Sequence, residues 1–285
     1  MNERRVIINA DDFGVSSAVN RAVIKGWQEG VLTSASLMVT GAACDEAVDL
    51  ARQNPGLQVG LHLTLVQGKS VLQQGGFPAL TDREGNFPND SVLAGMRMFF
   101  VKALHRQLRN EIEAQIEKFI ATGLPLSHID GHLNIHMHPT VFCILCPLLA
   151  KYDIRTFRLS RERLGSELRI DRNRLLGKAT DAFIFGRLAD RCRAELKIRR
   201  VDFASEVKGL LNSGRITEEY LLKALDSLQP GTTEIYLHPA EADNPEMPGY
   251  LQTDELAALL SSRVKERLGS PGIILCNYRG EVKDV

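Results

Sequence analysis

The stretch Val6-Ile-Ile-Asn-Ala-Asp11-Asp12-Phe-Gly14 is a short apolar run that ends in two adjacent carboxylates and a glycine. It is too short for a helix, and a continuous apolar run of this length is typical of a parallel strand buried on both faces. The alternative is a turn or a helix N-cap, which aspartate also favours and for which Ser16 and Ser17 are available. Two acids in sequence exceed what a cap needs, so we expect this strand to deliver them to a functional site.

A second stretch, Asp130-Gly-His-Leu-Asn-Ile-His-Met-His-Pro139, holds one carboxylate, one carboxamide and three imidazoles. An extended strand would put His132, Asn134, His136 and His138 on one face, because they alternate with apolar residues. If the strand ends after His132 and a helix follows, His132 and His136 lie four residues apart, a spacing that also lets two imidazoles bind one ion. A lone histidine is usually only hydrogen-bonded within a core, but three behind an aspartate predict a metal or catalytic site.

Two further apolar runs carry a histidine towards their carboxyl ends. They are Leu57-Gln-Val-Gly-Leu-His62-Leu-Thr-Leu and Glu234-Ile-Tyr-Leu-His238-Pro-Ala-Glu241, and in the second a proline ends the regular structure. Four strand-like segments therefore end in ionisable residues. In α/β proteins the carboxyl ends of parallel strands are where sites assemble, so we expect these side chains to meet.

Length and composition are those of an ordinary globular protein of one domain: 285 residues, 44% hydrophobic and 25% charged. Strand-like runs alternate with helix-like stretches, which we predict at residues 18–29, 45–53 and 106–121, as in βαβ units. We find no signal peptide and no run of about 18 apolar residues, so we expect a cytoplasmic protein. An odd number of cysteines, five, suits a reducing compartment.

Charge is unevenly distributed, although the formal net charge is zero. Residues 155–200 contain 14 Lys and Arg against 6 Asp and Glu, and apolar side chains recur near helical spacing between Phe183 and Leu196. This pattern favours an outer helix with a solvated basic face, or one that lies on the inner face of an anionic membrane. The segment Met96-Arg-Met-Phe-Phe-Val101 is a second apolar patch that could meet lipid. We expect no nucleic-acid binding, because no aromatic stacking pattern or recognition module accompanies the charge.

The chain resembles the YdjC-like carbohydrate deacetylases over most of its length. The motifs that carry the resemblance are Asn-Ala-Asp-Asp-Phe-Gly at 9–14, Leu-Thr-Ser-Ala-Ser-Leu-Met-Val at 32–39, Gly60-Leu-His62, His128-Ile-Asp-Gly-His132 with His136, and His238-Pro239. Within this family it looks most like the hopanoid biosynthesis-associated (HpnK) members. That similarity rests on residues 32–39, Arg97-Met-Phe-Phe, and Ala-Thr-Gly-Leu-Pro-Leu-Ser-His at 121–128.

The resemblance implies an α/β fold, an irregular (β/α) TIM-like barrel as in polysaccharide-deacetylase-like enzymes. It implies a single domain over 1–285, in which we expect a basic helical insertion around 160–215. The implied site holds one divalent metal on Asp12, His62 and His132, with Asp11 as general base and His238 as general acid. His136 and Asp130 are expected either as ligands or as the groups that orient them. Relatives often carry histidine where this chain has Leu133 and Asn134, so we expect neither of these two to bind the metal.

The expected activity is metal-dependent N-deacetylation of an N-acetylglucosamine-type sugar, because such a metal acidifies water and polarises the amide carbonyl. The substrate implied by the subfamily resemblance is an N-acetylglucosaminyl hopanoid lipid. The alternatives are a chitooligosaccharide such as diacetylchitobiose, or a catalytically silent barrel that binds sugar. We expect zinc or magnesium, with nickel, cobalt or manganese as alternatives, and a homodimer would be common for a chain of this size.

Overall fold

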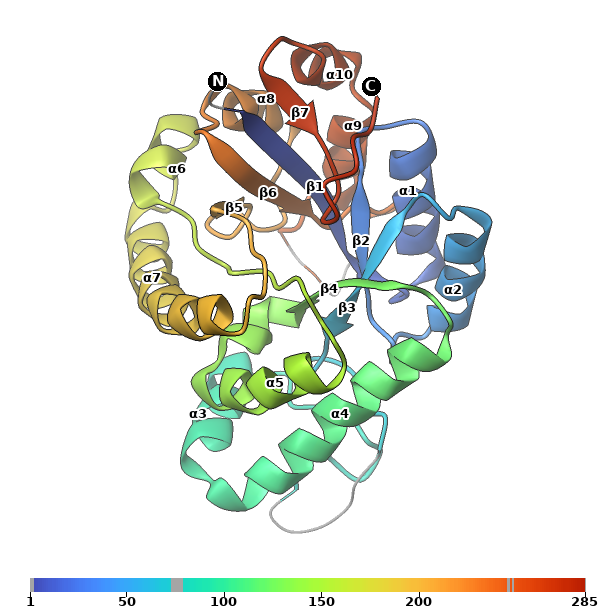
Figure 1. The fold of residues 1–285 in the computed structure, drawn as a ribbon, viewed down its shortest axis with the longest axis vertical. Helices are drawn as coiled ribbons and strands as arrows, with labels where there is room; N and C mark the ends of the chain where they lie inside the picture. Colours follow the sequence, from blue (N-terminus) through green and yellow to red (C-terminus); the bar gives the residue numbers. More distant parts are fainter. Residues whose placement is uncertain (1–2, 73–78, 245–246, 248, 285) are drawn as a thin grey trace.

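Parallel strands form a curled sheet at the centre of the molecule (Figure 1). The computed structural model describes residues 3–72, 79–244, 247 and 249–284. In this part of the chain the strand order is β4-β3-β2-β1-β6-β5, and β7 pairs with the first residues of β1. The strands are β1 (Arg4–Phe13), β2 (Ser34–Leu37), β3 (Gln58–Leu63), β4 (Leu126–Gly131), β5 (Glu206–Lys208), β6 (Gly231–Leu237) and β7 (Ile273–Leu275).

The strand β1 is the centre of the sheet, as its apolar sequence predicts. It pairs with β6 along residues 4–10, with β7 at its start and with β2 near its end. Val6, Ile8 and Ala10 are fully buried in the main hydrophobic core, which lies between the sheet and its helices. Strands pair with β1 on both edges, and neither face of β1 is open to solvent. Polar side chains are therefore tolerated on β1 only where other polar groups bind them, which happens at its carboxyl end.

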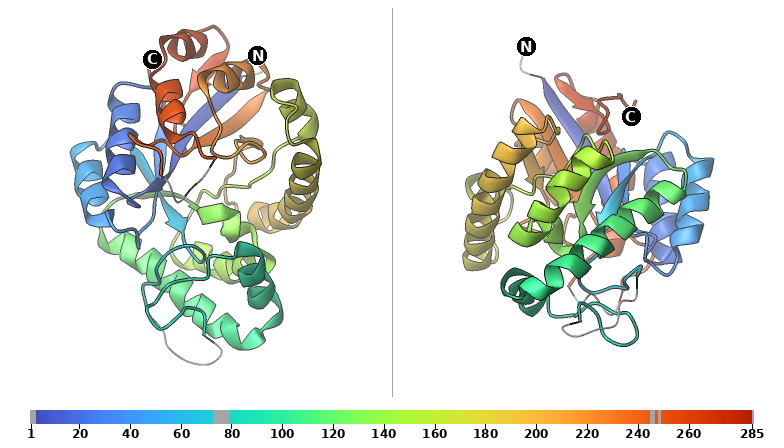
Figure 2. Two further views of the ribbon diagram at one scale, coloured as in Figure 1. Left: turned by 180° about the vertical axis from the view of Figure 1, so that it is seen from behind. Right: turned by 60° about the horizontal axis from the view of Figure 1, so that its bottom comes forward.

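Helices surround the sheet on its outer side (Figures 1 and 2). The predicted helices at 18–29, 45–53 and 106–121 are confirmed as α1, α2 and α4. The helices are α1 (Ser17–Gln28), α2 (Cys44–Gln53), α3 (Ser91–Phe100), α4 (His105–Ala121), α5 (Pro139–Lys151), α6 (Leu164–Ile170), α7 (Leu175–Ile198), α8 (Glu218–Asp226), α9 (Gln252–Leu260) and α10 (Ser262–Leu268), with 3-10 turns η1 (Lys102–Leu104) and η2 (His132–Met137).

The sheet curls into an incomplete barrel, which confirms the predicted irregular TIM-like architecture. Beyond β4 the curl continues through single parallel bridges, from Ile129 to Phe157 and from Thr156 to Asp202. At the opposite end of the strand order from β4, β5 pairs with β6. The strands of this sheet are parallel to one another, so their carboxyl ends lie together at one mouth of the barrel.

The histidine-rich stretch is neither the continuous strand nor the α-helix that the sequence allows. β4 ends at Gly131, and η2 begins with His132. Leu133 and Asn134 then adopt left-handed backbone conformations, with φ of 50° and 56°. These two residues break both the alternation of a strand and the regular turn of an α-helix. The side chain of His132 therefore points in a different direction from those of the histidines that follow it.

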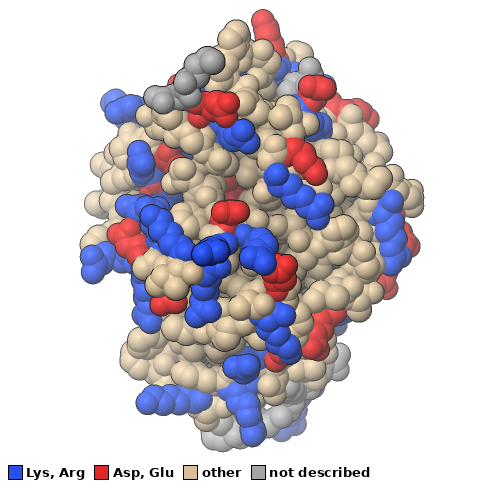
Figure 3. Space-filling view, in the orientation of Figure 1, with Lys and Arg blue, Asp and Glu red and all other residues tan. Residues whose placement is uncertain are grey.

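The basic segment 160–215 contains α6, α7 and β5. On α7, Cys192 and Leu196 are buried in the main core, and Phe185 and Leu188 are partly buried against it. Most Lys and Arg of the helix remain at the surface, and Figure 3 shows basic side chains on the side of the molecule where α7 lies. The apolar stripe of this helix is therefore largely used in packing on the barrel. No helix in the described residues is long and apolar enough to span a bilayer.

Candidate active site

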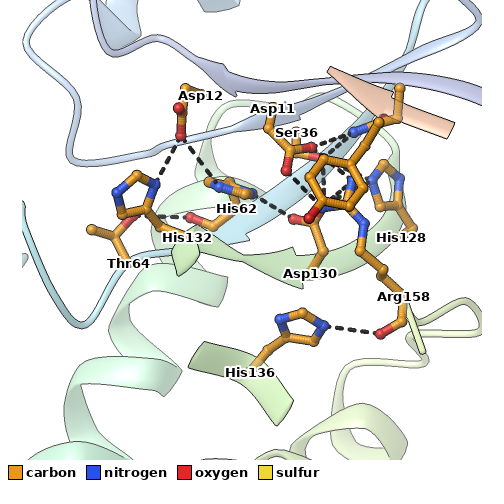
Figure 4. Close-up of polar contacts among 12 residues, drawn as sticks. Asp11, Asp12, Ser36, His62, Thr64, His128, Asp130, His132, His136 and Arg158 are labelled. Atoms are coloured by element: carbon orange, nitrogen blue, oxygen red, sulfur yellow. Dashed lines mark hydrogen bonds and ion pairs between the residues drawn. The ribbon is translucent and has the colours of Figure 1, made fainter. Parts of the chain in front are cut away.

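Two consecutive aspartates at the end of β1 both approach the centre of the site (Figure 4). In a regular strand Asp11 and Asp12 would point to opposite faces. The register with β2 shifts between Ala10 and Phe13, and Asp12 adopts a left-handed conformation with φ of 63°. This bulge redirects the second side chain, so that both carboxylates, each only 3% exposed, lie near His62.

Asp12, His62 and His132 bring one ligand atom each within 4.8 Å of one another. They come from the ends of β1 and β3 and from the first residue after β4. His132 Nδ1 lies 2.9 Å from Asp12 Oδ1, and His62 Nε2 lies 3.3 Å from the same oxygen. One carboxylate and two imidazoles are the donor set of many catalytic sites for zinc and related ions.

Asp130 fixes the orientation of His62 from behind. Its Oδ1 is 2.8 Å from His62 Nδ1, so the ring donates its Nδ1–H to the Asp130 carboxylate and turns Nε2 toward Asp12. A ring nitrogen that faces a carboxylate oxygen in this way requires a proton or a metal ion between the two atoms. This histidine–carboxylate arrangement, with three buried or nearly buried donors, fits a divalent metal at Asp12, His62 and His132.

The charges around His62 also favour a cation. Burial alone would lower its pKa, but the carboxylates of Asp130 and Asp11 outweigh burial and raise the pKa of His62 to about 10. Burial would likewise raise the pKa of Asp12, yet His132 and His62 hold it well below its usual range. The pocket therefore stabilises positive charge at the ring nitrogens, which a bound metal ion would supply in place of a proton.

Arg158 is the buried cation that joins the carboxylates of this site. Its Nη1 and Nη2 donate to the two oxygens of Asp11 at 2.7 Å each, Nη2 also lies 2.8 Å from Asp130, and Nε donates to Glu234 at 2.6 Å. The guanidinium is 1% exposed and stacks 4.5 Å from the centre of the Tyr236 ring. A fork of this kind fixes the plane of the Asp11 carboxylate, since both its oxygens are held.

Asp11 keeps an acceptor position that no described residue fills. Its Oδ1 accepts hydrogen bonds from Arg158 and from Asn9 Nδ2 at 2.8 Å, whereas Oδ2, among the residues that the structure describes, accepts only from Arg158. Because each carboxylate oxygen has two lone pairs, Oδ2 keeps one for another proton.

His238 lies in the same cavity as Asp11 and His132. The cavity has a volume of about 180 Å³, and its lining includes Asp11, His132, Tyr236, His238 and Tyr250. The His238 backbone N–H donates to Glu255, and its ring meets Tyr236 and Tyr250 edge-on at 5.7 and 5.0 Å. Its buried Nδ1 has no hydrogen-bond partner within the described part of the chain and lies 3.9 Å from Glu255 Oε2. His132 also borders a larger cavity of about 840 Å³, which reaches Asp12.

His136 stands behind the group of metal-ligand atoms. Its Nε2 bonds to the backbone carbonyl of Arg158 at 2.9 Å, and burial lowers its pKa to about 4. Asp130 likewise contacts His62 at Nδ1, the ring nitrogen that faces away from Asp12. Both residues are therefore placed where they orient neighbouring residues of the site. Leu133 and Asn134, for which we expect no metal contact, line the smaller cavity.

The sequence motifs do not include Arg158, although the sequence carries one signal for it. It sits in Thr156-Phe-Arg-Leu-Ser160, a single cation in a short, strand-like segment, and a buried arginine requires acidic partners. Its partners Asp11, Asp130 and Glu234 are distant in sequence, so the segment alone could not identify them.

Known proteins share this chain's sequence and fold. A family model described as YdjC-like protein matches residues 5–270. A carbohydrate deacetylase of Geobacillus stearothermophilus is 31% identical, with 97% of each chain covered. A chitooligosaccharide deacetylase of Salmonella typhi is also 31% identical, over 96% of this chain and 99% of its own length. A solved structure from Enterococcus faecalis V583, whose name refers to cellobiose-phosphate cleavage, is 29% identical, superposes with a TM-score of 0.75, and covers 99% of this chain and all of that one. The chain therefore belongs to the YdjC-like protein family.

Proposed function

We propose that this protein is a metal-dependent carbohydrate deacetylase that hydrolyses the N-acetyl group of an N-acetylglucosamine-type sugar. The observation that carries the proposal is the group of Asp12, His62 and His132 with an oriented carboxylate, Asp11, on one side and His238 in the adjoining cavity. A site that only held a metal for structure would have no use for this additional acid and base. The names of the full-length relatives support the same reaction.

A divalent ion at this group would lower the pKa of a water molecule and polarise the amide carbonyl. Asp11 takes the proton of the attacking water on Oδ2, while Arg158 and Asn9 hold the carboxylate in place. The C–N bond breaks as the departing amine takes a proton, for which His238 is the donor. The products are acetate and the free amino sugar, and the chain needs no covalent nucleophile.

For the substrate, we propose an N-acetylglucosaminyl hopanoid lipid, on the basis of the subfamily motifs at 32–39, 97–100 and 121–128. The alternative is a soluble chitooligosaccharide, which is supported by the name of the Salmonella typhi relative. Acetate release from both substrates, with metal-stripped protein and zinc, magnesium, nickel, cobalt or manganese added back singly, separates these proposals. Turnover of the soluble sugar alone would contradict the lipid assignment, and no release with any ion would favour a silent sugar-binding barrel.

The assigned roles predict two classes of variant. Asp11→Asn and His238→Ala should lower kcat by about 100-fold or more, the scale of general acid–base catalysis, while bound metal stays nearly unchanged. Asp12→Ala, His62→Ala and His132→Ala should each reduce the metal content. The measurements are acetate release and elemental analysis of the same preparations. Activity close to that of the parent in Asp11→Asn would overturn the assignment of the base.

A further inference from the structure

Helix α3 presents an apolar face that the described residues leave uncovered. Its exposed side chains are Val92 (71%), Leu93 (53%), Met96 (54%), Phe99 (49%) and Phe100 (72%). Their spacing places them on one side of the helix. Buried Ala94 and Met98 hold the opposite side against the rest of the protein. Large apolar side chains gathered on one exposed face mark an interaction surface.

Beyond the acidic N-cap Asp90, the charge along α3 and the start of α4 is positive. Residues 91–109 contain four basic residues and no Asp or Glu: Arg97, Lys102, Arg106 and Arg109. Lys102 and Arg106 are exposed and form no ion pair with any residue that the structure describes. At the lowest end of the molecule in Figure 3, near the junction of α3 and α4 in Figure 1, the visible charged side chains are basic.

The same helix borders the route to the proposed catalytic site. Arg97 lines a cavity of about 980 Å³ together with Leu80 and Phe87. This cavity shares Val15, Met38, Gln67 and Asn89 with the cavity that reaches Asp12 and His132. A surface on which α3 docks would therefore lie next to the outer of these two cavities.

We propose that the exposed face of α3 docks on the surface of an anionic lipid bilayer. An apolar helix face with flanking Lys and Arg inserts at the boundary of headgroups and acyl chains, where the basic side chains meet acidic lipids. A second copy of the chain is a poorer occupant, since it would bring the same positive charge against this face. Helix α7 is also basic, but Cys192 and Leu196 of its apolar stripe are buried in the core and Phe185 and Leu188 pack against it, which leaves Phe183 and Ile184 exposed at one end.

Vesicle co-sedimentation tests the proposal with no substrate present, so its result does not depend on the deacetylase activity. The metal-loaded protein is mixed with vesicles of phosphatidylcholine alone, or of phosphatidylcholine with phosphatidylglycerol. We expect binding to the anionic vesicles that weakens as salt is raised. The double variant Val92→Ser/Phe100→Ser should lower the partition coefficient by about tenfold or more, because it removes two large inserted side chains.

Phe183→Ser is the matched control, because Phe183 on α7 is 71% exposed, nearly the same as Phe100. It should bind like the parent protein, whereas Lys102→Gln/Arg106→Gln should lose affinity for anionic vesicles only. All these side chains are exposed, so circular dichroism and turnover of a soluble chitooligosaccharide should be unchanged. Parent protein that stays in the supernatant with every vesicle, loss of binding in Phe183→Ser alone, or a dimer that the α3 variant dissociates in ultracentrifugation would each overturn the proposal.

Discussion

Asp130 acts on the proposed metal group through His62. Its Oδ1 orients the imidazole, and its Oδ2 accepts a 2.7 Å hydrogen bond from Ser36 and lies 2.8 Å from Arg158. Arg158 and His62 outweigh the effect of burial and lower the pKa of this carboxyl, so Asp130 stays ionised. A charged acceptor makes His62 a stronger ligand than a neutral acceptor would.

Asp130→Asn should therefore weaken metal binding by about 10- to 100-fold, the usual effect of changing a group behind a ligand. The measurement is a competition titration with a metal chelator. Asp49→Asn, at an exposed position on α2, is the control and should bind like the parent. An unchanged metal affinity in Asp130→Asn would mean that this carboxylate has no influence on the group.

At the scale of elements, the packing of β3 against β4 depends on the absence of a side chain at Gly60. A Cβ there would lie 2.4 Å from the ring of His128 on the neighbouring strand. His128 is fully buried and stacks on Tyr278 with ring centres 3.8 Å apart, so it has no free space to move into. Gly186 in α7 differs, because a Cβ there would meet nothing within 4 Å.

The two glycines should respond oppositely to the same substitution. Gly60→Ala should destabilise the fold by about 1–3 kcal/mol through overpacking. Gly186→Ala should stabilise it by about 0.5–1 kcal/mol, because alanine has the higher helix propensity. Thermal unfolding of both variants checks the pair, and a Tm change of the same sign in both would contradict this account of the β3–β4 contact.

At the scale of the whole molecule, buried histidines make stability depend on pH. Burial lowers the pKa of His136 to about 4 and that of His128 to about 3. Between these values and the ordinary pKa of about 6.5, the unfolded chain binds protons that the folded chain does not. The free energy of unfolding should therefore fall as pH drops from about 6.5 toward 4, by a few kcal/mol for each ring.

In the metal-free protein, His62 acts in the opposite direction and in a different window. Its raised pKa gives a stabilisation that is complete below about pH 6.5 and is lost as pH rises toward 10. Denaturant unfolding of chelator-treated protein should thus show greatest stability near neutral pH. His136→Leu should flatten the acid limb, while His105→Leu, at a partly exposed position on α4, should leave the slope unchanged. An acid limb equally steep in His136→Leu would contradict the assignment.

The sequence by itself determined the elements whose signals are local. The apolar run before Asp11 and Asp12 predicts a buried strand because hydrophobic pattern and length are properties of neighbouring residues. The helices at 18–29, 45–53 and 106–121 follow from the same kind of pattern. The strand-like segments and the family motifs predict His62 and His132 as site residues, and the structure places both beside Asp12.

Only the tertiary structure decided how these side chains face one another. The left-handed backbone at Asp12, Leu133 and Asn134 is stabilised by the surrounding fold, and no local preference of leucine predicts it. Arg158 contacts Asp11 across 147 positions of sequence. That contact exists because the curled sheet brings the ends of separate strands and the segment after α5 to one point, and the burial of three carboxylates there requires a cation.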